Sequence, residues 1–106
     1  MLSVTLRQLE VFRNVVDTGS FSAAATVLGI SQPSVSMHIR ALETHLREPV
    51  FERQRGQAPA LTDIGRRVYD HAGDILTQSD RALVDIRALQ SVRDNVLSFA
   101  AHRFIG

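Results

Sequence analysis

The side chains with the clearest chemical potential form one polar face of a helix that begins after Ser31. They carry amide, hydroxyl, thioether, imidazole and guanidinium groups, and they are Gln32, Ser34, Ser36, Met37, His38 and Arg40. An amide in the first turn can bind N6 and N7 of adenine in a bidentate way, and a methionine can contact the methyl group of thymine. Such a face suits base edges and phosphates in the major groove of DNA.

Some of these side chains have a plainer interpretation. Gln32 could fill an exposed first turn, and His38 could be a solvated surface histidine rather than a contact to a base or to the DNA backbone. Arg40 is either a phosphate ligand or the partner of Glu43 or Glu10. The sequence leaves these alternatives open.

Two helical segments must position the polar face. Ser20 and Ser31 are candidate N-caps, Gly29 stands where a left-handed residue ends a helix, and Pro33 lies in a first turn where its missing N–H costs little. The expected helices cover Phe21–Leu28 and about Gln32–Leu46, with inward-facing Ala24, Val27 and Leu28 in the first and Val35, Ile39 and Leu42 in the second. Residues 21–40 therefore have the pattern of a helix-turn-helix.

A third helix precedes this pair. Thr5 and Gln8 form a capping-box pair, and an apolar stripe then runs to just before Gly19. The three helices share one expected core, made of Leu9, Phe12, Val16, Phe21, Ala24, Ala25, Leu28, Ile30, Val35, Ile39 and Leu42.

A hairpin wing is expected after the helix-turn-helix. Val50–Arg53 and Ala60–Thr62 read as two short strands around a turn with Gly and Pro, and Arg53 and Arg55 flank its tip. In winged folds such cations enter the minor groove or bind the DNA backbone. The residues expected at DNA are Ser20, Ser22, Ser31, Gln32, Pro33, Ser34, Ser36, Met37, His38, Arg40, Arg53 and Arg55. For Ser20 and Ser22, simple capping is an equally good explanation.

Thr62 caps a long fourth segment whose apolar and small residues are alternately four and three apart. This spacing is typical of a coiled-coil seam and predicts dimerisation, unless the stripe packs on its own domain. The expected seam is Val68, Ala72, Ile75, Leu76, Ser79, Ala82, Leu83, Ile86 and Leu89. Residues 92–104 could extend the helix, because Val92, Val96 and Phe99 have helical spacing.

At these residues the chain resembles the N-terminal DNA-binding domain of LysR-type bacterial transcriptional regulators. The residues in the order and spacing of that family are Leu6-Arg-Gln-Leu9, Phe12, Gly19-Ser-Phe21, Ala24-Ala25, Ser31-Gln-Pro33, Ser36, Ile39-Arg-Ala-Leu-Glu43, Phe51-Glu-Arg53, Leu61-Thr62 and Gly65. They lie within residues 4–90, and the combination is highly specific.

The resemblance implies a mainly α fold, a three-helix winged helix-turn-helix with a two-stranded wing and a long linker helix. It assigns residues 4–62 to the DNA-binding domain, 63–90 to the linker helix, and 91–106 to a hinge or the start of a missing effector-binding domain. It implies a homodimer with antiparallel linker helices on an interrupted palindrome of double-stranded DNA. The chain would then be a fragment of a longer regulator, in which a higher oligomer and a small-molecule effector on the missing domain are expected.

Four positions depart from the family. The family usually has Gly where Arg47 stands and Leu where Val50 stands, often a basic residue at Met37, and frequently Gln at His38. Arg47 would need a left-handed backbone at a cost of about 1 kcal/mol, or the helix ends differently. A basic contact to guanine or phosphate is missing at Met37.

Composition limits the classes of protein to which the chain could belong. A chain of 106 residues with 44% hydrophobic residues is expected to form one globular domain, and without an apolar span or a signal peptide it is expected in the cytoplasm, with no membrane partner. It has no cysteine, and its four histidines lack metal-ligand spacing, so neither a metal nor a cofactor is expected. The net charge of +1 argues only weakly for nucleic acid.

Two other classes of function fit these residues less well. An enzyme could use Ser36 and His38 in a triad, but residues two apart lie on different faces of a helix, and no acid is placed to orient the histidine. A winged helix that binds protein would lack polar groups on the DNA-facing side, and here they are present. The sequence thus predicts a DNA-binding transcriptional regulator without catalytic activity.

Overall fold

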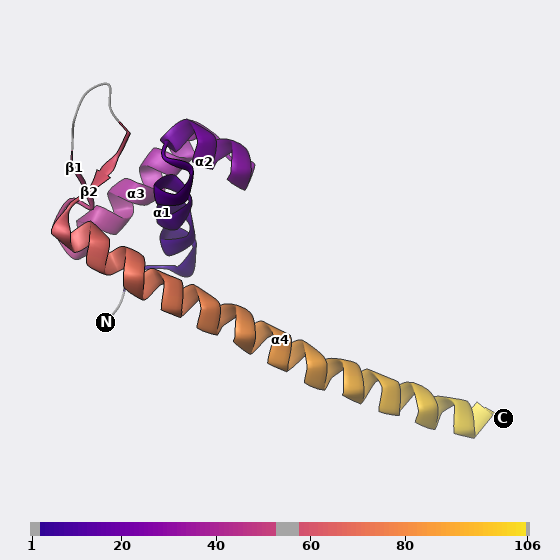
Figure 1. Cartoon of the computed structure of the whole chain (residues 1–106). Coiled ribbons are helices and arrows are strands. Elements are labelled where there is room, and N and C mark those ends of the chain that lie inside the picture. Colours follow the sequence, from indigo (N-terminus) through magenta and orange to yellow (C-terminus); the bar gives the residue numbers. More distant parts are fainter. Residues whose placement is uncertain (1–2, 53–57, 106) are drawn as a thin grey trace. The chain divides into compact units, whose positions relative to one another are not determined.

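The computed structural model describes residues 3–52 and 58–105, and side chains as far as Phe99. Four helices and a two-stranded sheet follow one another in the order α1 (Leu6–Thr18), α2 (Phe21–Leu28), α3 (Gln32–Leu46), β1 (Phe51–Glu52), β2 (Ala60–Leu61) and α4 (Asp63–Ile105) (Figure 1). The chain divides into two compact units, Met1–Leu76 and Thr77–Gly106, with the boundary inside α4.

The expected caps form at the starts of the first three helices. Thr5 and Gln8 make the reciprocal capping box, with the Gln8 N–H 3.1 Å from Thr5 Oγ1 and the Thr5 N–H 3.2 Å from Gln8 Oε1. The Ser20 hydroxyl oxygen caps α2 and the Ser31 hydroxyl oxygen caps α3. Each cap satisfies a backbone N–H that has no partner inside its helix.

Two helices, α2 and α3, end on residues with a left-handed backbone. Gly29 ends α2 with φ of 68°, as predicted, and Arg47 ends α3 in the same left-handed region with φ of 61°. Arg47 is the one non-glycine residue with positive φ in the described part of the chain. The structure thus confirms the first of the two alternatives for Arg47, a strained but regular helix end.

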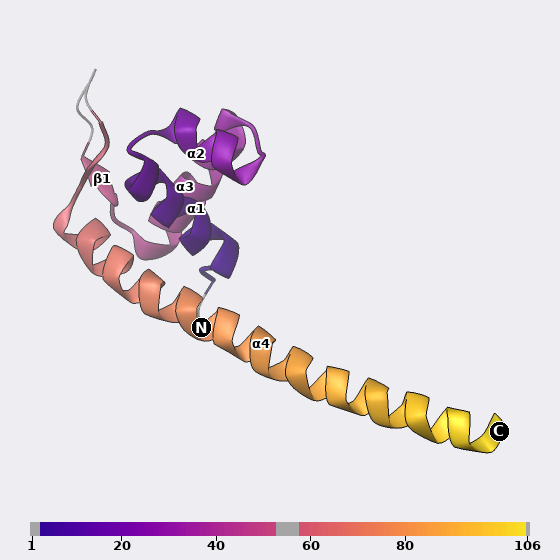
Figure 2. The same ribbon diagram turned by 45° about the vertical axis from the view of Figure 1, so that its right-hand side comes forward.

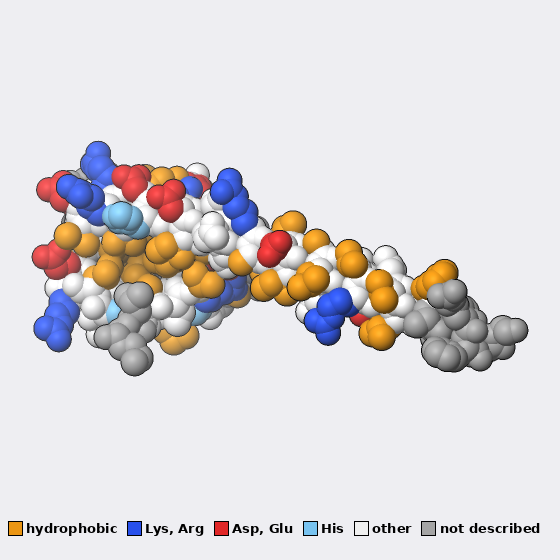
Figure 3. Space-filling view, turned by 90° about the horizontal axis from the view of Figure 1, so that it is seen from below, with side chains coloured by type: hydrophobic (Ala, Val, Ile, Leu, Met, Phe, Trp, Pro, Cys, Tyr) orange, Lys and Arg blue, Asp and Glu red, His pale blue; other side chains and the backbone are white. Residues whose placement is uncertain are grey.

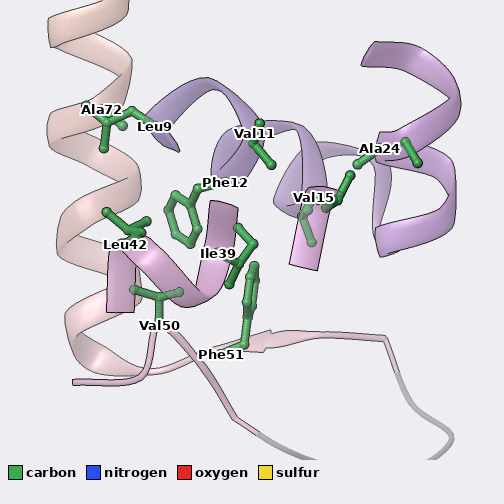
Figure 4. Close-up of a cluster of buried hydrophobic side chains, with 12 residues drawn as sticks. Leu9, Val11, Phe12, Val15, Ala24, Ile39, Leu42, Val50, Phe51 and Ala72 are labelled. Atoms are coloured by element: carbon green, nitrogen blue, oxygen red, sulfur yellow. The ribbon is translucent and has the colours of Figure 1, made fainter. Parts of the chain in front are cut away.

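The three helices α1, α2 and α3 pack against one another around a shared core (Figures 1 and 2). Its buried side chains are Leu9, Val11, Phe12, Val15, Ala24, Ala25, Val35, Ile39, Leu42, Val50, Phe51 and Ala72 (Figure 4). The Phe51 ring lies 5.4 Å from the Phe12 ring and 5.7 Å from the Phe21 ring, so the first strand is anchored to the helices by aromatic contacts.

Several apolar residues are less buried than the sequence predicts. Val27 was expected to face inward, but 65% of it is exposed, because the short α2 buries only Ala24 and Ala25 fully. Val16, Phe21, Leu28 and Ile30 are only partly buried.

The two strands pair antiparallel, with Phe51 opposite Leu61 and Glu52 opposite Ala60. The start of α4 is held against them, because the Thr62 N–H donates to the Val50 carbonyl at 3.1 Å and Thr62 Oγ1 accepts the Gly65 N–H at 2.9 Å. A Cβ atom on Gly65 would lie 2.0 Å from the Val50 carbonyl oxygen. Only glycine therefore allows the first turn of α4 to lie this close to the chain at Val50.

The next turns of α4 are fastened to α1 by a cluster of polar groups. The Arg13 guanidinium lies 4.1 Å from the centre of the Tyr69 ring, and its Nη1 donates to the Tyr69 carbonyl at 3.0 Å. The Tyr69 hydroxyl donates to Asp17 Oδ1 at 2.6 Å, and this bond, followed by desolvation, raises the pKa of Tyr69 above its ordinary value. Gly73 leaves the room that the Arg13 side chain fills.

α4 continues to Ile105, so residues 92–104 extend the helix, as the helical spacing of their apolar residues allowed. None of the helices in the described residues is long and apolar enough to cross a membrane.

Candidate nucleic-acid interface

α3 separates its side chains sharply into two faces. Val35, Ile39 and Leu42 are almost completely buried against α1 and α2, with exposures of 0%, 4% and 0%. The opposite face is open, and 61% of Met37 is exposed, as are Gln32, Pro33 and Arg40. The fold therefore presents the polar face as predicted and uses the apolar face to hold it in place.

Hydrogen bonds from Ser31 hold the first turn of α3 in place. Ser31 Oγ accepts the Ser34 N–H at 3.2 Å and donates to the Ser34 hydroxyl at 3.0 Å, and the Val35 N–H donates to the Ser31 carbonyl at 3.1 Å. Pro33 has no N–H, and the Gln32 N–H, at the first helical position, has no acceptor within the helix. Gln32 thus extends from a fixed helix end that carries partial positive charge.

Ser20 and Ser22 lie at the start of α2. Ser20 Oγ accepts the Ala23 N–H at 2.9 Å, so the capping interpretation holds for this residue. Its hydroxyl hydrogen remains available to an acceptor outside the chain. Ser22 is exposed, and its carbonyl accepts the Thr26 hydroxyl at 3.2 Å.

Arg40 is free of both carboxylates that the sequence offered it. Glu10 pairs with Arg7, and Glu43 Oε2 accepts the Val50 N–H at 2.9 Å. No ion pair within residues 3–52 and 58–99 includes Arg40, whose exposed side chain borders a shallow surface groove. Neither of the intramolecular ion pairs that the sequence offered to Arg40 forms within the described residues.

The remaining candidates are less exposed or lie elsewhere. Ser34, Ser36 and His38 are partly buried. Arg53 and Arg55 lie outside the described residues. Arg66 and Arg67 are exposed in the first turns of α4. In the described chain no three histidine or carboxylate side chains are close enough to hold a metal ion.

The expected dimerisation seam is corrected at its N-terminal end. Ala72 is completely buried in the domain's own core, and Val68 and Leu76 pack against that core, so this part of the stripe is largely used within the chain. The sequence pattern could not separate the two uses, because a seam and a core-facing stripe have nearly the same period. Ile75, Ala82, Leu83, Ile86 and Leu89 are exposed and Ser79 is partly buried.

Comparisons with known proteins point to one family. The model of the family described as bacterial regulatory helix-turn-helix protein, lysR family, matches residues 6–66. A probable RuBisCO transcriptional regulator of Cyanidioschyzon merolae is 42% identical over 93 residues, which cover 85% of this chain and 30% of that protein. The chain thus spans about a third or less of the curated relatives it matches.

Two solved structures are similar in fold. The CbnR_DBD–DNA complex has a TM-score of 0.73 and 33% identity, and covers 79% of this chain and 95% of that one. The BenM_DBD/catB site 1 DNA complex has a TM-score of 0.77 and 32% identity, and covers 82% of this chain and 96% of that one. The predicted mainly α fold, a winged helix-turn-helix followed by a long helix, is confirmed.

Proposed function

The chain belongs to the LysR family of bacterial regulatory helix-turn-helix proteins, and we propose that it acts as a sequence-specific DNA-binding region that regulates transcription. The observation that carries the proposal is the division of α3 into a buried face and an exposed polar face. Because Val35, Ile39 and Leu42 fix the helix, its free face can enter a major groove without rearrangement. The solved structures with similar folds include two protein–DNA complexes, which supports the same role here.

The residues divide into two kinds of contact. Gln32, Ser34, Ser36 and Met37 are assigned to base edges, since they lie in the first two turns of α3. The residues assigned to phosphates and positioning are Ser20, Ser22, Ser31, Pro33, His38 and Arg40, together with Arg53 and Arg55 of the wing on the backbone or minor groove.

The proposed unit of binding is a homodimer joined through α4. Five exposed apolar side chains of this helix, Ile75, Leu83, Ile86, Leu89 and Val96, have exposures between 45% and 62%. So many large apolar groups on one helix favour association with another apolar surface. Two copies related by a two-fold axis would bind an interrupted palindrome, because symmetric dimers bind symmetric half-sites.

Selection of bound duplexes from a random pool tests the proposal directly. We expect the enriched sequences to contain two inverted half-sites at a fixed spacing. Matched selection with a chain carrying Gln32→Ala and Arg40→Ala together should give much weaker enrichment. An unenriched pool with the unchanged chain would refute sequence-specific binding.

A further inference from the structure

Arg47, the residue that ends α3, has a backbone conformation that suits glycine better. Its φ is 61°, and no other non-glycine residue in the described part of the chain has a positive φ. A side chain with this backbone costs stability relative to glycine. Strained residues cluster at functional sites, where the side chain has a task that outweighs the strain. The DNA contacts proposed so far give Arg47 no such task.

Arg47 lies at the end of a strip of exposed residues that runs along α3. Pro33, Met37, Arg40, Thr44 and Arg47 are spaced four, three, four and three apart, so they follow one another along one side of the helix. All five are exposed. The exposed strip therefore continues the proposed DNA contacts of Pro33, Met37 and Arg40 to the C-terminal end of the helix.

The opposite side of α3 is apolar. Leu42 and Leu46 line an apolar groove of about 440 Å³ on the first unit, together with residues of α1 and the start of α4. Hydrophobic side chains gather on the face of the unit that Figure 3 shows. A polyanion is bound through cations, so the exposed strip is the side of α3 that can add contacts to DNA.

Arg40 and Arg47 border the same shallow groove at the C-terminal end of α3, which has a volume of about 290 Å³. Within residues 3–52 and 58–99 Arg47 forms no ion pair, and the same holds for Arg40. Thr44 lies between them and uses its hydroxyl within the helix, where it donates to the Arg40 carbonyl at 2.9 Å. The groove thus combines two guanidinium groups that have no carboxylate partner in the described chain.

Two glutamates also line this groove, and neither forms an ion pair with Arg47 in the described residues. Glu43 Oε2 accepts the Val50 N–H at 2.9 Å, so this carboxylate is held by the chain that follows α3. Glu48 is exposed. A negative charge beside the two arginines weakens their attraction for an anion, which gives Glu48 a definite effect on binding.

We propose that Arg47 binds a phosphate of the DNA backbone near the one that Arg40 binds. The inference rests on the DNA binding of the proposed function and adds a residue to it. A guanidinium presents a planar fork of N–H donors that matches two phosphate oxygens. Because the contact is to the backbone, it adds affinity on every sequence and no discrimination between bases. The strain at Arg47 places a cation where glycine would leave none.

Arg47→Gln tests the contact, because it removes the charge and keeps both the side-chain stem and the strained backbone. We expect a three- to tenfold loss of affinity, equal on the selected operator and on scrambled duplex, and a salt dependence flatter by about one unit of slope. Arg47→Lys keeps the charge and should restore most of the slope. Arg93→Gln, at an exposed position of α4 without a proposed contact, is the matched control and should change affinity less than twofold.

Glu48→Gln tests the same groove in the opposite direction. Loss of the negative charge beside Arg47 should raise affinity about twofold or more on both duplexes. An unchanged or lowered affinity would contradict a phosphate at this end of α3.

Uncharged methylphosphonate groups locate the contact on the DNA. With one such group at each position of the operator in turn, we expect one position to weaken the unchanged chain and to have no further effect on Arg47→Gln. If every position weakened the two proteins equally, Arg47 would not touch a phosphate.

Arg47→Gly separates this role from a structural one, since a cation at a helix C-terminus also interacts favourably with the helix dipole. We expect a protein that resists urea better and binds DNA three- to tenfold more weakly. A less stable variant with normal DNA affinity would overturn the phosphate contact in favour of the dipole. A chain that enriches no duplex refutes the proposed function, whereas sequence-specific binding that is insensitive to Arg47→Gln refutes the phosphate contact alone.

Discussion

Gln32 is exposed in the first turn of α3, next to the Ser31 cap that begins the helix. We expect Gln32→Ala to weaken binding to the selected operator by about 1–3 kcal/mol, because a bidentate base contact carries that much discrimination. Affinity for random duplex should change much less, since phosphate contacts carry it. Binding isotherms on operator and scrambled DNA measure both quantities.

Thr44→Ala is the matched control for this prediction. Thr44 is an exposed residue in the C-terminal half of the same helix, and its hydroxyl donates to the Arg40 carbonyl within the helix at 2.9 Å. Its removal should alter neither affinity by more than a few tenths of a kcal/mol. Equal losses on operator and scrambled DNA for Gln32→Ala would make Gln32 a positioning residue.

Tyr69 offers a second test at the scale of one residue, because it is the only tyrosine and the chain has no tryptophan. The Asp17 carboxylate that accepts the hydroxyl bond raises the pKa of Tyr69. Ultraviolet titration of tyrosinate should therefore give a midpoint above the ordinary value, and Asp17→Asn should lower it. The folded form prefers the protonated phenol, so the stabilising bond persists below the ordinary pKa and is lost as pH rises through the raised one.

The control is Asp70→Asn, since Asp70 contributes the smallest of the effects that raise the pKa of Tyr69. The titration midpoint of Tyr69 should shift less in Asp70→Asn than in Asp17→Asn. An unchanged midpoint in Asp17→Asn would show that the bond between α1 and α4 does not persist in solution.

At the scale of the element, α3 ends on a residue that does not suit its backbone. Arg47 has φ of 61°, and a side chain in this region costs about 1 kcal/mol relative to glycine. We expect Arg47→Gly to raise the free energy of unfolding in urea by about 0.5–1 kcal/mol. DNA affinity should fall in the same variant, because the proposed phosphate contact is lost.

Gly29 provides the opposite substitution at the end of α2. Its φ is 68° and an added Cβ would meet nothing within 4 Å, so Gly29→Ala isolates the backbone cost. The loss should be about 1 kcal/mol. If both variants moved stability in the same direction, the left-handed backbone would not explain either result.

At the scale of the whole molecule, dimerisation and operator binding should be coupled. Ile86→Asp places a charge in the seam of both copies, so we expect a monomer in light scattering at concentrations where the unchanged chain is dimeric. Operator affinity should fall by about a hundredfold or more, because the second half-site then gains no effective concentration. Affinity for a single half-site should stay the same.

Val84→Asp serves as the control, since it adds the same charge to an exposed position on another side of α4. Both its mass and its operator affinity should match the unchanged chain. A monomeric Ile86→Asp that still binds the full operator normally would separate DNA binding from dimerisation.

Local sequence signals were sufficient to predict where the first three helices begin and which face of α3 is exposed. The caps Thr5, Ser20 and Ser31 and the left-handed Gly29 act within a few residues, so sequence spacing alone determined the helix starts and the turn. The exposed face of α3 followed from the period of Val35, Ile39 and Leu42.

Tertiary structure decided what depends on segments distant in sequence. Ala72 and Ile75 fit the same heptad pattern, yet Ala72 is completely buried in the core and Ile75 stays 45% exposed at the edge of an apolar groove. The Arg13, Asp17 and Tyr69 cluster joins residues more than fifty positions apart, and Val50 and Phe51 entered the core because the strand folds back on the helices. Periodicity reports which side of an element is apolar, and only packing determines which surface covers it.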